Sequence, residues 1–462
     1  MFHSLTLTAR QHAQLREHLF PGDGREAVAL LLCGRAVGAE RVRLVASEVH
    51  LVPHRACTRT PTRVTWPTDE LPKLLGHAAR CGLSLIKIHG HAGFGRFSQE
   101  DDASDRALFP SVHGWAKGPH GSAIMLDGDR VFGRLVGADG AFTPLDRVAS
   151  IGDDIRFWDS DSKAAVIPEH GRRVAQSFGA GTYATLGRLR IGVVGCSGTG
   201  SVVIDQLARN CVGELVLIDP DRVEAKNLNR IVNSRLADAE QARLKVDVVT
   251  EAIAGLGFGT RVEAYACSLF APDAVRAIAS CDLVFGCMDS IDGRHLLNRL
   301  STFYGVPYLD LGVKLEADGL GGVDQVCGTV HYLQPGGSSL HSRHVYTLEQ
   351  VRAAGLSRVD PSGYRALKRE GYIKGVAEDR PAVIQLNSLI ASLAVNELLA
   401  RLHPYRLDPN SDYAIHRISL SHGIYEYLPD GEPCPLLARH LGRGDVEPLL
   451  DMPELSLETI AA

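Results

Sequence analysis

The stretch RIGVVGCSGTGSVVIDQLARNCVGELVLIDP, residues 190–220, decides the fold of the larger part of this 462-residue chain. RIGVVG predicts a buried strand, SVVIDQLARN a helix, and ELVLIDP a second strand. A strand, a crossover helix and a strand in that order predict a parallel, doubly wound α/β sheet. More strands are expected at RVEAYAC, CDLVFGCM and VPYLDLG, so the C-terminal half is expected to be a Rossmann-like nucleotide-binding domain.

The turn GCSGTG, residues 195–200, lies between the first strand and the first helix of this pattern. Backbone N–H groups and the positive end of the helix face a phosphate-sized site in such a turn. Asp219 ends the next strand, where its carboxylate can accept hydrogen bonds from a ribose hydroxyl. These features predict a nucleotide site, and a dinucleotide-dependent dehydrogenase would share them.

Two further runs do not belong to a dehydrogenase. IDPDRVEAKNLNR covers residues 218–230, and CMDSIDGRHLLNR covers residues 287–299. With the helix PAVIQLNSLIASLAVNELLARL, they resemble the superfamily of ubiquitin-activating enzymes and the thiamine- and molybdopterin-pathway adenylyltransferases. The likeness extends from about Val166 to Asp445, and it implies that ATP adenylates the C-terminal glycine of a small protein.

The resemblance also implies roles for individual residues. Arg230 and Lys245 would hold the phosphates of ATP and Asp289 would coordinate Mg²⁺, because two anions meet only when positive charge neutralises them. Arg173 matches an arginine that one subunit of a family dimer contributes to the active site of the other, which implies a homodimer. Ser197 stands where the family usually has glycine. The remaining residues implied at the nucleotide are Gly195, Gly198, Gly200, Asp219, Asp221 and Asn227, although Asp221 could instead cap a turn.

Cysteine usage departs from the family pattern. The thioester cysteine normally lies in the crossover segment, but residues 328–433 contain no cysteine. Cys327 is the nearest candidate, and its run VDQVCGTV predicts a strand, where a buried thiol would be inert. The adenylate is therefore expected to pass directly to a ubiquitin-conjugating-like enzyme. The CxxC pairs that hold structural zinc in relatives are absent, although His341 and His344 could form a residual site.

The N-terminal run IHGHAGFGRFSQEDD, residues 88–102, places two histidines at the end of an apolar strand with both side chains on one face. His89, His91 and a carboxylate would leave a fourth Zn²⁺ position for water, as a catalytic zinc requires. The upstream Glu26 could take the proton of that water. An HxH pair alone is more often two unrelated packing histidines; Ser98 and Asp101 at a spacing of three strengthen the metal interpretation.

Together these residues resemble the JAMM metalloprotease motif over about residues 1–145. The resemblance implies a cytidine-deaminase-like α/β domain with zinc ligands His89, His91 and Asp101, general base Glu26, and Ser98 stabilising the oxyanion. Ala92 replaces the usual proline and the loop before Ser98 is one residue short. Asp102 is therefore the alternative ligand, and a metal-free recognition module is the alternative to an isopeptidase.

Composition limits the remaining possibilities. With 45% hydrophobic residues and a net charge of −5, the chain has no overall basic field, and nucleic acid is not an expected partner. No apolar run approaches the roughly 20 residues of a membrane span, so a cytoplasmic protein with reduced cysteines is expected. The expected organisation is a JAMM domain over 1–145, a linker over 146–165, an adenylyltransferase over 166–445 and a tail over 446–462.

The combined interpretation is a bacterial-style enzyme with two active sites. One would adenylate the C-terminal glycine of a ubiquitin-like protein, and the other would trim the precursor or cleave its conjugates. The first alternative is activation of a sulfur-carrier protein for cofactor biosynthesis. The second is an adenylyltransferase joined to an inactive JAMM-like module.

Overall fold

The computed structural model describes residues 1–161, 166–317, 322–369 and 383–456, and it contains two compact units. Unit 1 comprises Met1–Lys163, Phe303–Gly305 and His440–Ala462, and unit 2 comprises Ala164–Thr302 and Val306–Arg439. None of the helices in the described parts is both long and apolar enough to cross a lipid bilayer.

Unit 1 is built on a nine-stranded mixed sheet with the strand order β11-β10-β1-β3-β2-β6-β7-β8-β9. Its strands are β1 (Phe2–Thr8), β2 (Val28–Val37), β3 (Arg41–Leu51), β6 (Ser84–His91), β7 (Gly121–Leu126), β8 (Val131–Val136), β9 (Phe142–Pro144), β10 (Arg147–Ile151) and β11 (Ile155–Asp159). A separate hairpin joins β4 (Thr58–Thr60) and β5 (Arg63–Thr65).

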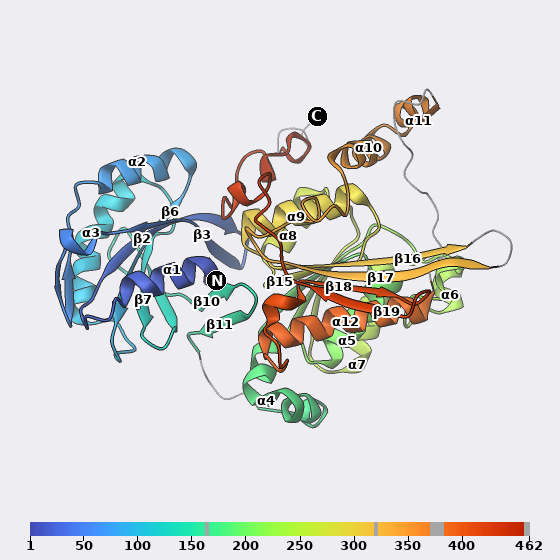
Figure 1. Cartoon of the computed structure of the whole chain (residues 1–462), viewed down its shortest axis with the longest axis horizontal. Helices are drawn as coiled ribbons and strands as arrows, with labels where there is room; N and C mark the ends of the chain where they lie inside the picture. Colours follow the sequence, from blue (N-terminus) through green and yellow to red (C-terminus); the bar gives the residue numbers. More distant parts are fainter. Residues whose placement is uncertain (162–165, 318–321, 370–382, 457–462) are drawn as a thin grey trace. The chain divides into compact units, whose positions relative to one another are not determined.

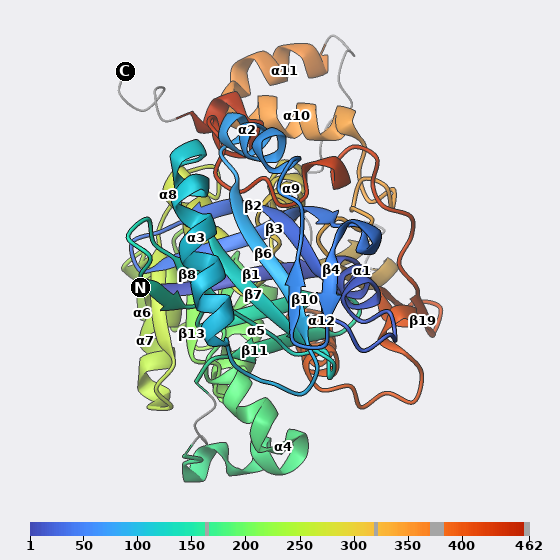
Figure 2. The ribbon, with the colours of Figure 1, turned by 90° about the vertical axis from the view of Figure 1, so that its left-hand side faces the viewer.

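Three helices cover the two faces of this sheet. Leu15 and Leu19 of α1 (Ala9–Leu19) belong to one buried apolar cluster with β1, β2 and β6. Helices α2 (Leu71–Cys81) and α3 (Gln99–Trp115) contribute to a second cluster with the alternate residues of β2 and β6. Figure 2 shows α2 and α3 on the near face of the sheet. The alternation of side chains along each strand therefore fills two separate cores.

Two predicted boundaries of unit 1 differ from the structure. Residues 146–165, expected to be a linker, contain β10 and β11, which extend the sheet beyond β1. Residues 440–445, expected in the adenylyltransferase, belong to unit 1, where Gly444 pairs with Arg35 of β2.

Unit 2 contains the doubly wound sheet that residues 190–220 predict. The sheet has eight strands in the order β14-β13-β12-β15-β16-β17-β18-β19. They are β12 (Arg190–Val194), β13 (Glu214–Ile218), β14 (Arg261–Tyr265), β15 (Leu283–Gly286), β16 (Tyr308–Ala317), β17 (Val323–Leu333), β18 (Ile415–Ser419) and β19 (Ile424–Leu428). The first five are parallel, and β17, β18 and β19 continue the sheet in antiparallel pairs.

Helices lie on both faces of the unit 2 sheet. In Figure 1, α5, α7 and α12 lie on one side and α8 and α9 on the other. This arrangement agrees with right-handed crossovers between parallel strands. The helices are α4 (Arg172–Leu186), α5 (Gly198–Arg209), α6 (Leu236–Glu240), α7 (Lys245–Leu256), α8 (Pro272–Ala279), α9 (Ile291–Tyr304), α10 (Leu348–Val359), α11 (Pro361–Arg369) and α12 (Ile384–Leu402).

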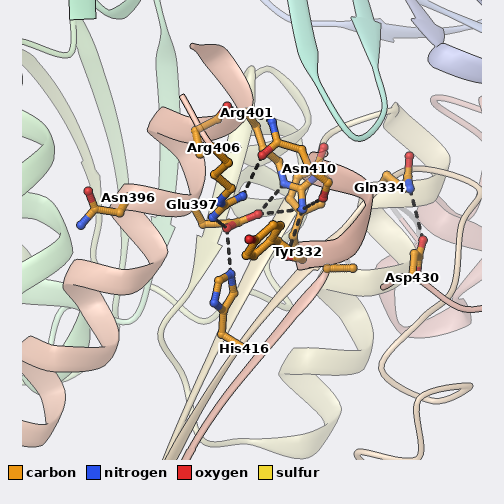
Figure 3. Close-up of polar contacts among 12 residues, drawn as sticks. Tyr332, Gln334, Asn396, Glu397, Arg401, Arg406, Asn410, His416 and Asp430 are labelled. Carbon is orange, nitrogen blue, oxygen red and sulfur yellow. Dashed lines mark hydrogen bonds and ion pairs between the residues drawn. The ribbon is translucent and has the colours of Figure 1, made fainter. Parts of the chain in front are cut away.

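A buried ionic network anchors the C-terminal half of α12 (Figure 3). The Glu397 carboxylate accepts a hydrogen bond of 2.7 Å from Arg401 Nε, lies 2.8 Å from His416 Nε2 on β18, and pairs with Arg406. The side chains of Glu397 and Arg401 are fully buried. Burial alone would raise the pKa of Glu397, but the hydrogen bond with His416 and the positive charge of Arg401 outweigh it and lower the pKa to about 2.

Replacing Glu397 by alanine is expected to lower the free energy of unfolding by about 3–5 kcal/mol, because it leaves buried positive charge without its partner. Since the pKa of Glu397 is lower in the folded chain than its ordinary 4.5, its contribution is complete above pH 4.5 and is lost as the pH falls towards about 2. Urea denaturation at several pH values measures both effects. The exposed Glu426→Ala change on β19 is the control and should cost under about 0.5 kcal/mol.

Candidate functional site

The carboxyl ends of three parallel strands define the candidate nucleotide site of unit 2. The chain passes from β12 outward to β13 and β14 and then returns to the other side of β12 to form β15. The strand order therefore reverses between β12 and β15, and ligands of doubly wound sheets bind at such a reversal. The glycine turn follows β12, Asp219 follows β13 and Asp289 follows β15, so the topology brings these predicted residues to one edge.

The glycines of the turn are required by close packing. Gly195 has φ of 93° and its N–H donates to Ile218 O at 2.8 Å. A Cβ added to Gly195 would lie 2.6 Å from Cys287 O, and one added to Gly200 would overlap Gly195 O. The turn can therefore lie directly against the end of β15 only with glycine in these places. Helix α5 begins at Gly198, within the turn, so its first N–H groups point towards this edge.

Asp219 holds the turn together. Its Oδ2 accepts from the backbone N–H of Cys196 at 2.7 Å and its Oδ1 accepts from that of Asp221 at 2.9 Å. Burial raises the pKa of Asp219, and the nearby Lys245 ammonium opposes that rise. Lys245 Nζ is itself buried, donates to Asp221 Oδ2 at 2.7 Å and lies 3.9 Å from Asp219 Oδ1. The structure thus brings Asp219, Asp221 and Lys245 together in one ionic group beside the turn.

Arg230 lies against the first turn of α5. A Cβ added to Gly198 would come within 3.0 Å of Arg230 Cδ. The guanidinium donates to Lys226 O at 2.9 Å and to Asn229 Oδ1 at 3.2 Å. Asn227 is buried, and its Oδ1 accepts from the N–H of Glu224 within the same loop. Asn227 therefore orders the segment that carries Arg230.

Asp289 and its neighbours occupy the loop after β15. Asp289 is exposed, and Cys287, two residues before it, donates its N–H to Val194 O at 2.8 Å. Arg294 and Asp292 are near neighbours on α9 but do not pair with each other. Arg294 Nε instead donates to the buried Asp310 Oδ1 on β16 at 2.9 Å, and Asp292 pairs with Arg358.

Two predicted residues lie away from this edge. Arg173 is exposed in the first turn of α4, where it donates to Gln176 Oε1 at 3.3 Å. Cys327 is half-buried in the middle of β17, opposite Lys314 of β16 and Ser419 of β18. The strand predicted for VDQVCGTV is therefore confirmed.

Asn387, which is not among the predicted site residues, lies beside the glycine turn. Thr199 Oγ1 donates to Asn387 Oδ1 at 3.2 Å, although 188 residues separate the two. Asn387 is 3% exposed in the N-terminal part of α12. An amide in the mostly apolar run VIQLNSLIASLAV is a signal that could have identified it.

The N-terminal candidate residues also come together, within unit 1. Val28 of β2 pairs with His89 of the antiparallel β6, which places Glu26 beside His91. One ligand atom each of Glu26, His89 and His91 lies within 4.8 Å of the others, and no other group of three such residues was found in the described parts of the chain. His89 Nε2 and His91 Nε2 are 3.0 Å apart, and His91 Nε2 is 3.6 Å from Glu26 Oε1.

Asp101 completes this cluster and Asp102 does not. Asp101 Oδ1 lies 3.0 Å from His89 Nε2, and Asp101 Oδ2 lies 3.6 Å from His91 Nε2. Ser98 caps α3 and donates its hydroxyl to Asp101 Oδ2 at 2.8 Å. Asp102 points away and pairs with Arg134. Of the two candidate carboxylates, the geometry favours Asp101.

The electrostatics of the cluster fit a divalent cation. Burial lowers the pKa of His89, which favours the neutral imidazole that can ligate a metal. Burial would raise the pKa of Asp101, but its hydrogen bonds with His89 and Ser98 lower it below its ordinary range. Burial and the negative charge of Asp101 raise the pKa of Glu26 to about 7. Two imidazoles and a carboxylate facing one another form the donor set that Zn²⁺ prefers.

Two curated proteins resemble this chain over part of its length. The chain is 25% identical over 284 residues to the ubiquitin-like modifier-activating enzyme 5 of Oryza sativa subsp. japonica, which covers 59% of this chain and 60% of that protein. It is 34% identical over 118 residues to the SAMP-activating enzyme E1 of Haloferax volcanii. This match covers 26% of this chain and 43% of that protein. The chain thus spans less than two thirds of the length of these relatives.

Solved structures and a family model give further matches. A crystal structure of E. coli MccB with MccA-N7isoASN superposes with a TM-score of 0.46 and 16% identity, covering 58% of this chain and 74% of that one. The model of the ThiF family matches residues 170–430, more than half of the 462 residues. This chain therefore belongs to the ThiF family.

Proposed function

We propose that unit 2 uses ATP to adenylate the C-terminal carboxylate of a ubiquitin-like protein. The observation that carries this proposal is the strand reversal between β12 and β15, which gathers the glycine turn, Arg230, Lys245 and Asp289 at one edge of the sheet. Two relatives are named as activating enzymes, one for a ubiquitin-like modifier and one for SAMP. Family membership and this gathering of charges support the same reaction.

In the proposed reaction, an oxygen of the partner's terminal carboxylate bonds to the α-phosphorus of ATP, and the bond to the β-phosphate breaks to release pyrophosphate. The N–H groups at the start of α5 and the Arg230 guanidinium would bind phosphate oxygens. Lys245 would exchange part of its contact with Asp221 for a phosphate oxygen. Asp289 would hold Mg²⁺, which offsets the repulsion between the two anions.

The fate of the activated carboxylate is a separate part of the proposal. Cys327 sits in the middle of a β-ladder, so we propose direct transfer to a thiol of a ubiquitin-conjugating-like enzyme. Activation of a sulfur-carrier protein is the alternative, and the acceptor distinguishes the two. A homodimer in which Arg173 reaches the neighbouring site is also proposed, and the exposure of Arg173 on α4 is compatible with it.

For unit 1 we propose a zinc-dependent peptidase or isopeptidase that acts after the partner's terminal glycine. The support is the cluster of His89, His91, Asp101 and Glu26, because three would ligate the metal and the fourth could carry a proton. Bound zinc would lower the pKa of a coordinated water to about 7. Glu26 would take the proton of that water and deliver it to the departing amine, and the Ser98 hydroxyl would face the developing oxyanion.

The adenylation proposal is tested by exchange of radiolabelled pyrophosphate into ATP. Ubiquitin-like proteins of the source cell would be supplied one at a time, each as a matched pair with and without its terminal glycine. Exchange should appear with one intact partner and disappear with its truncated form. The proposal would be contradicted if exchange occurred without any partner. It would also be contradicted if no intact partner supported exchange.

A further inference from the structure

Asn387 presents a hydrogen-bond donor for which the described residues provide no acceptor. Its Oδ1 accepts from Thr199 Oγ1 at 3.2 Å, but its Nδ2 has no hydrogen-bond partner among the parts of the chain that the structure describes. Asn387 is only 3% exposed, so bulk water does not solvate the amide. An unmet buried N–H group typically costs about 1–3 kcal/mol, so its retention requires an explanation.

The unmet donor lies against the first turn of α5. A Cβ added to Gly198 would overlap Asn387 Nδ2 and come within 3.0 Å of Arg230 Cδ. The amide of α12 and the stem of Arg230 therefore lie against the same residue, the first of α5. Because α5 is a 12-residue helix, its N-terminal N–H groups carry a partial positive charge at this point.

Three of the polar groups at the start of α5 can bind an anion. The N–H groups of α5 and the Arg230 guanidinium attract an anion, and the Asn387 N–H adds a neutral donor with a fixed direction. An anionic oxygen is the group that satisfies all three, and a hydrogen bond to a charged acceptor is worth about 1.5–3 kcal/mol.

We propose that Asn387 is a ligand-positioning residue that donates its Nδ2–H to an anionic oxygen bound at the N-terminus of α5. The inference rests on the proposed adenylation. It adds that a residue from α12, far from the glycine turn in sequence, selects and orients the ligand. The oxygen belongs either to a phosphate of the nucleotide or to the carboxyl group under activation.

Two substitutions separate donation from packing. Asn387→Asp keeps the shape and the acceptor for Thr199 but replaces the N–H donor by an oxygen. Asn387→Leu keeps most of the volume and removes the donor without adding charge. Both variants should bind ligand about ten- to a hundredfold more weakly than the wild type. Asn387→Asp should have the lower affinity of the two, because its carboxylate also repels an anion.

The measurement is calorimetric titration of the full chain, in the presence of Mg²⁺, with AMP, ATP and glycyl sulfamoyl adenosine. If all three ligands bind more weakly, the contact lies at the α-phosphate or the sulfamoyl group that replaces it. If only ATP binds more weakly, the contact lies at the β- or γ-phosphate. Weaker binding of the glycyl compound alone places it at the acyl group. Each of these results supports the proposal.

Matched variants exclude a general loss of structure. Asn396→Asp changes an exposed amide on the same helix and should bind all three ligands as the wild type does. Thr199→Val removes the hydroxyl that contacts Asn387 but leaves the donor, so it should shift the melting temperature more than the affinity. If both Asn387 variants bound the ligands with wild-type affinity, the inference about Asn387 would be overturned but the proposed adenylation would not. A wild type that binds none of the three would overturn the proposed adenylation as well.

Discussion

Replacing Asp289 by asparagine is expected to reduce partner-dependent pyrophosphate exchange at least about a hundredfold. The carboxylate follows β15 at the strand reversal, directly beyond the peptide that packs against Gly195. An amide keeps the size of the side chain but removes the charge that would hold Mg²⁺, and metal neutralisation contributes several kcal/mol to reactions of this class. The rate of exchange under saturating ATP measures the loss.

Stability should not change in this variant, because Asp289 is exposed. Thermal unfolding of Asp289→Asn is therefore expected to match that of the wild type. Asp273→Asn, which alters an exposed carboxylate on α8, is the control and should exchange at the wild-type rate. If Asp289→Asn exchanged normally, the assignment of the magnesium ligand would be wrong even though the family assignment stands.

The second large effect is expected at the metal cluster of unit 1. Glu26→Ala should retain about one equivalent of zinc but lose at least about a hundredfold in cleavage after the terminal glycine, because no base then carries the proton to the departing amine. His89→Ala should lose both zinc and cleavage, because His89 is buried beside His91 and Asp101. Metal analysis by mass spectrometry and cleavage of a glycine-extended partner separate the two roles.

Two comparisons make this test specific. Asp101→Ala should lose zinc, whereas Asp102→Ala should retain it, since Asp102 pairs with Arg134. Glu17→Ala, an exposed change on α1, should affect neither zinc nor cleavage. Wild-type cleavage by Glu26→Ala, or a wild type prepared without chelator that contains no zinc, would leave the recognition-module alternative as the better account of unit 1.

The parts of the molecule that the sequence predicted are those in which local pattern determines structure. The apolar runs around Gly195 and Asp219 are short, are separated by a glycine turn and a helix, and leave only a parallel arrangement of the strands. Asp219 ends the second of these strands and hydrogen-bonds to the turn, and Lys245 lies beside it. In unit 1, the two-residue spacing of His89 and His91 places both side chains on one face of the strand, independently of tertiary contacts.

The parts that it did not predict depend on long-range contacts. The segment containing β10 is short and is bounded by aspartate and glycine, and it becomes a strand because β1 offers a parallel edge to it. Arg294 of α9 pairs with Asp310 of β16 and not with the nearby Asp292. Asn387 reaches Thr199 only because α12 packs against α5, and no local pattern shows that contact.

The most direct test of the central claim is the intact mass of the ubiquitin-like partner after incubation with ATP, Mg²⁺ and the full chain, in the absence of any acceptor thiol. The account predicts a species heavier than the partner by one AMP, formed only when the terminal glycine is present and absent with Asp289→Asn. A partner whose mass stays unchanged with the wild-type chain, under conditions in which the chain binds ATP, would contradict adenylation by this ThiF-family protein.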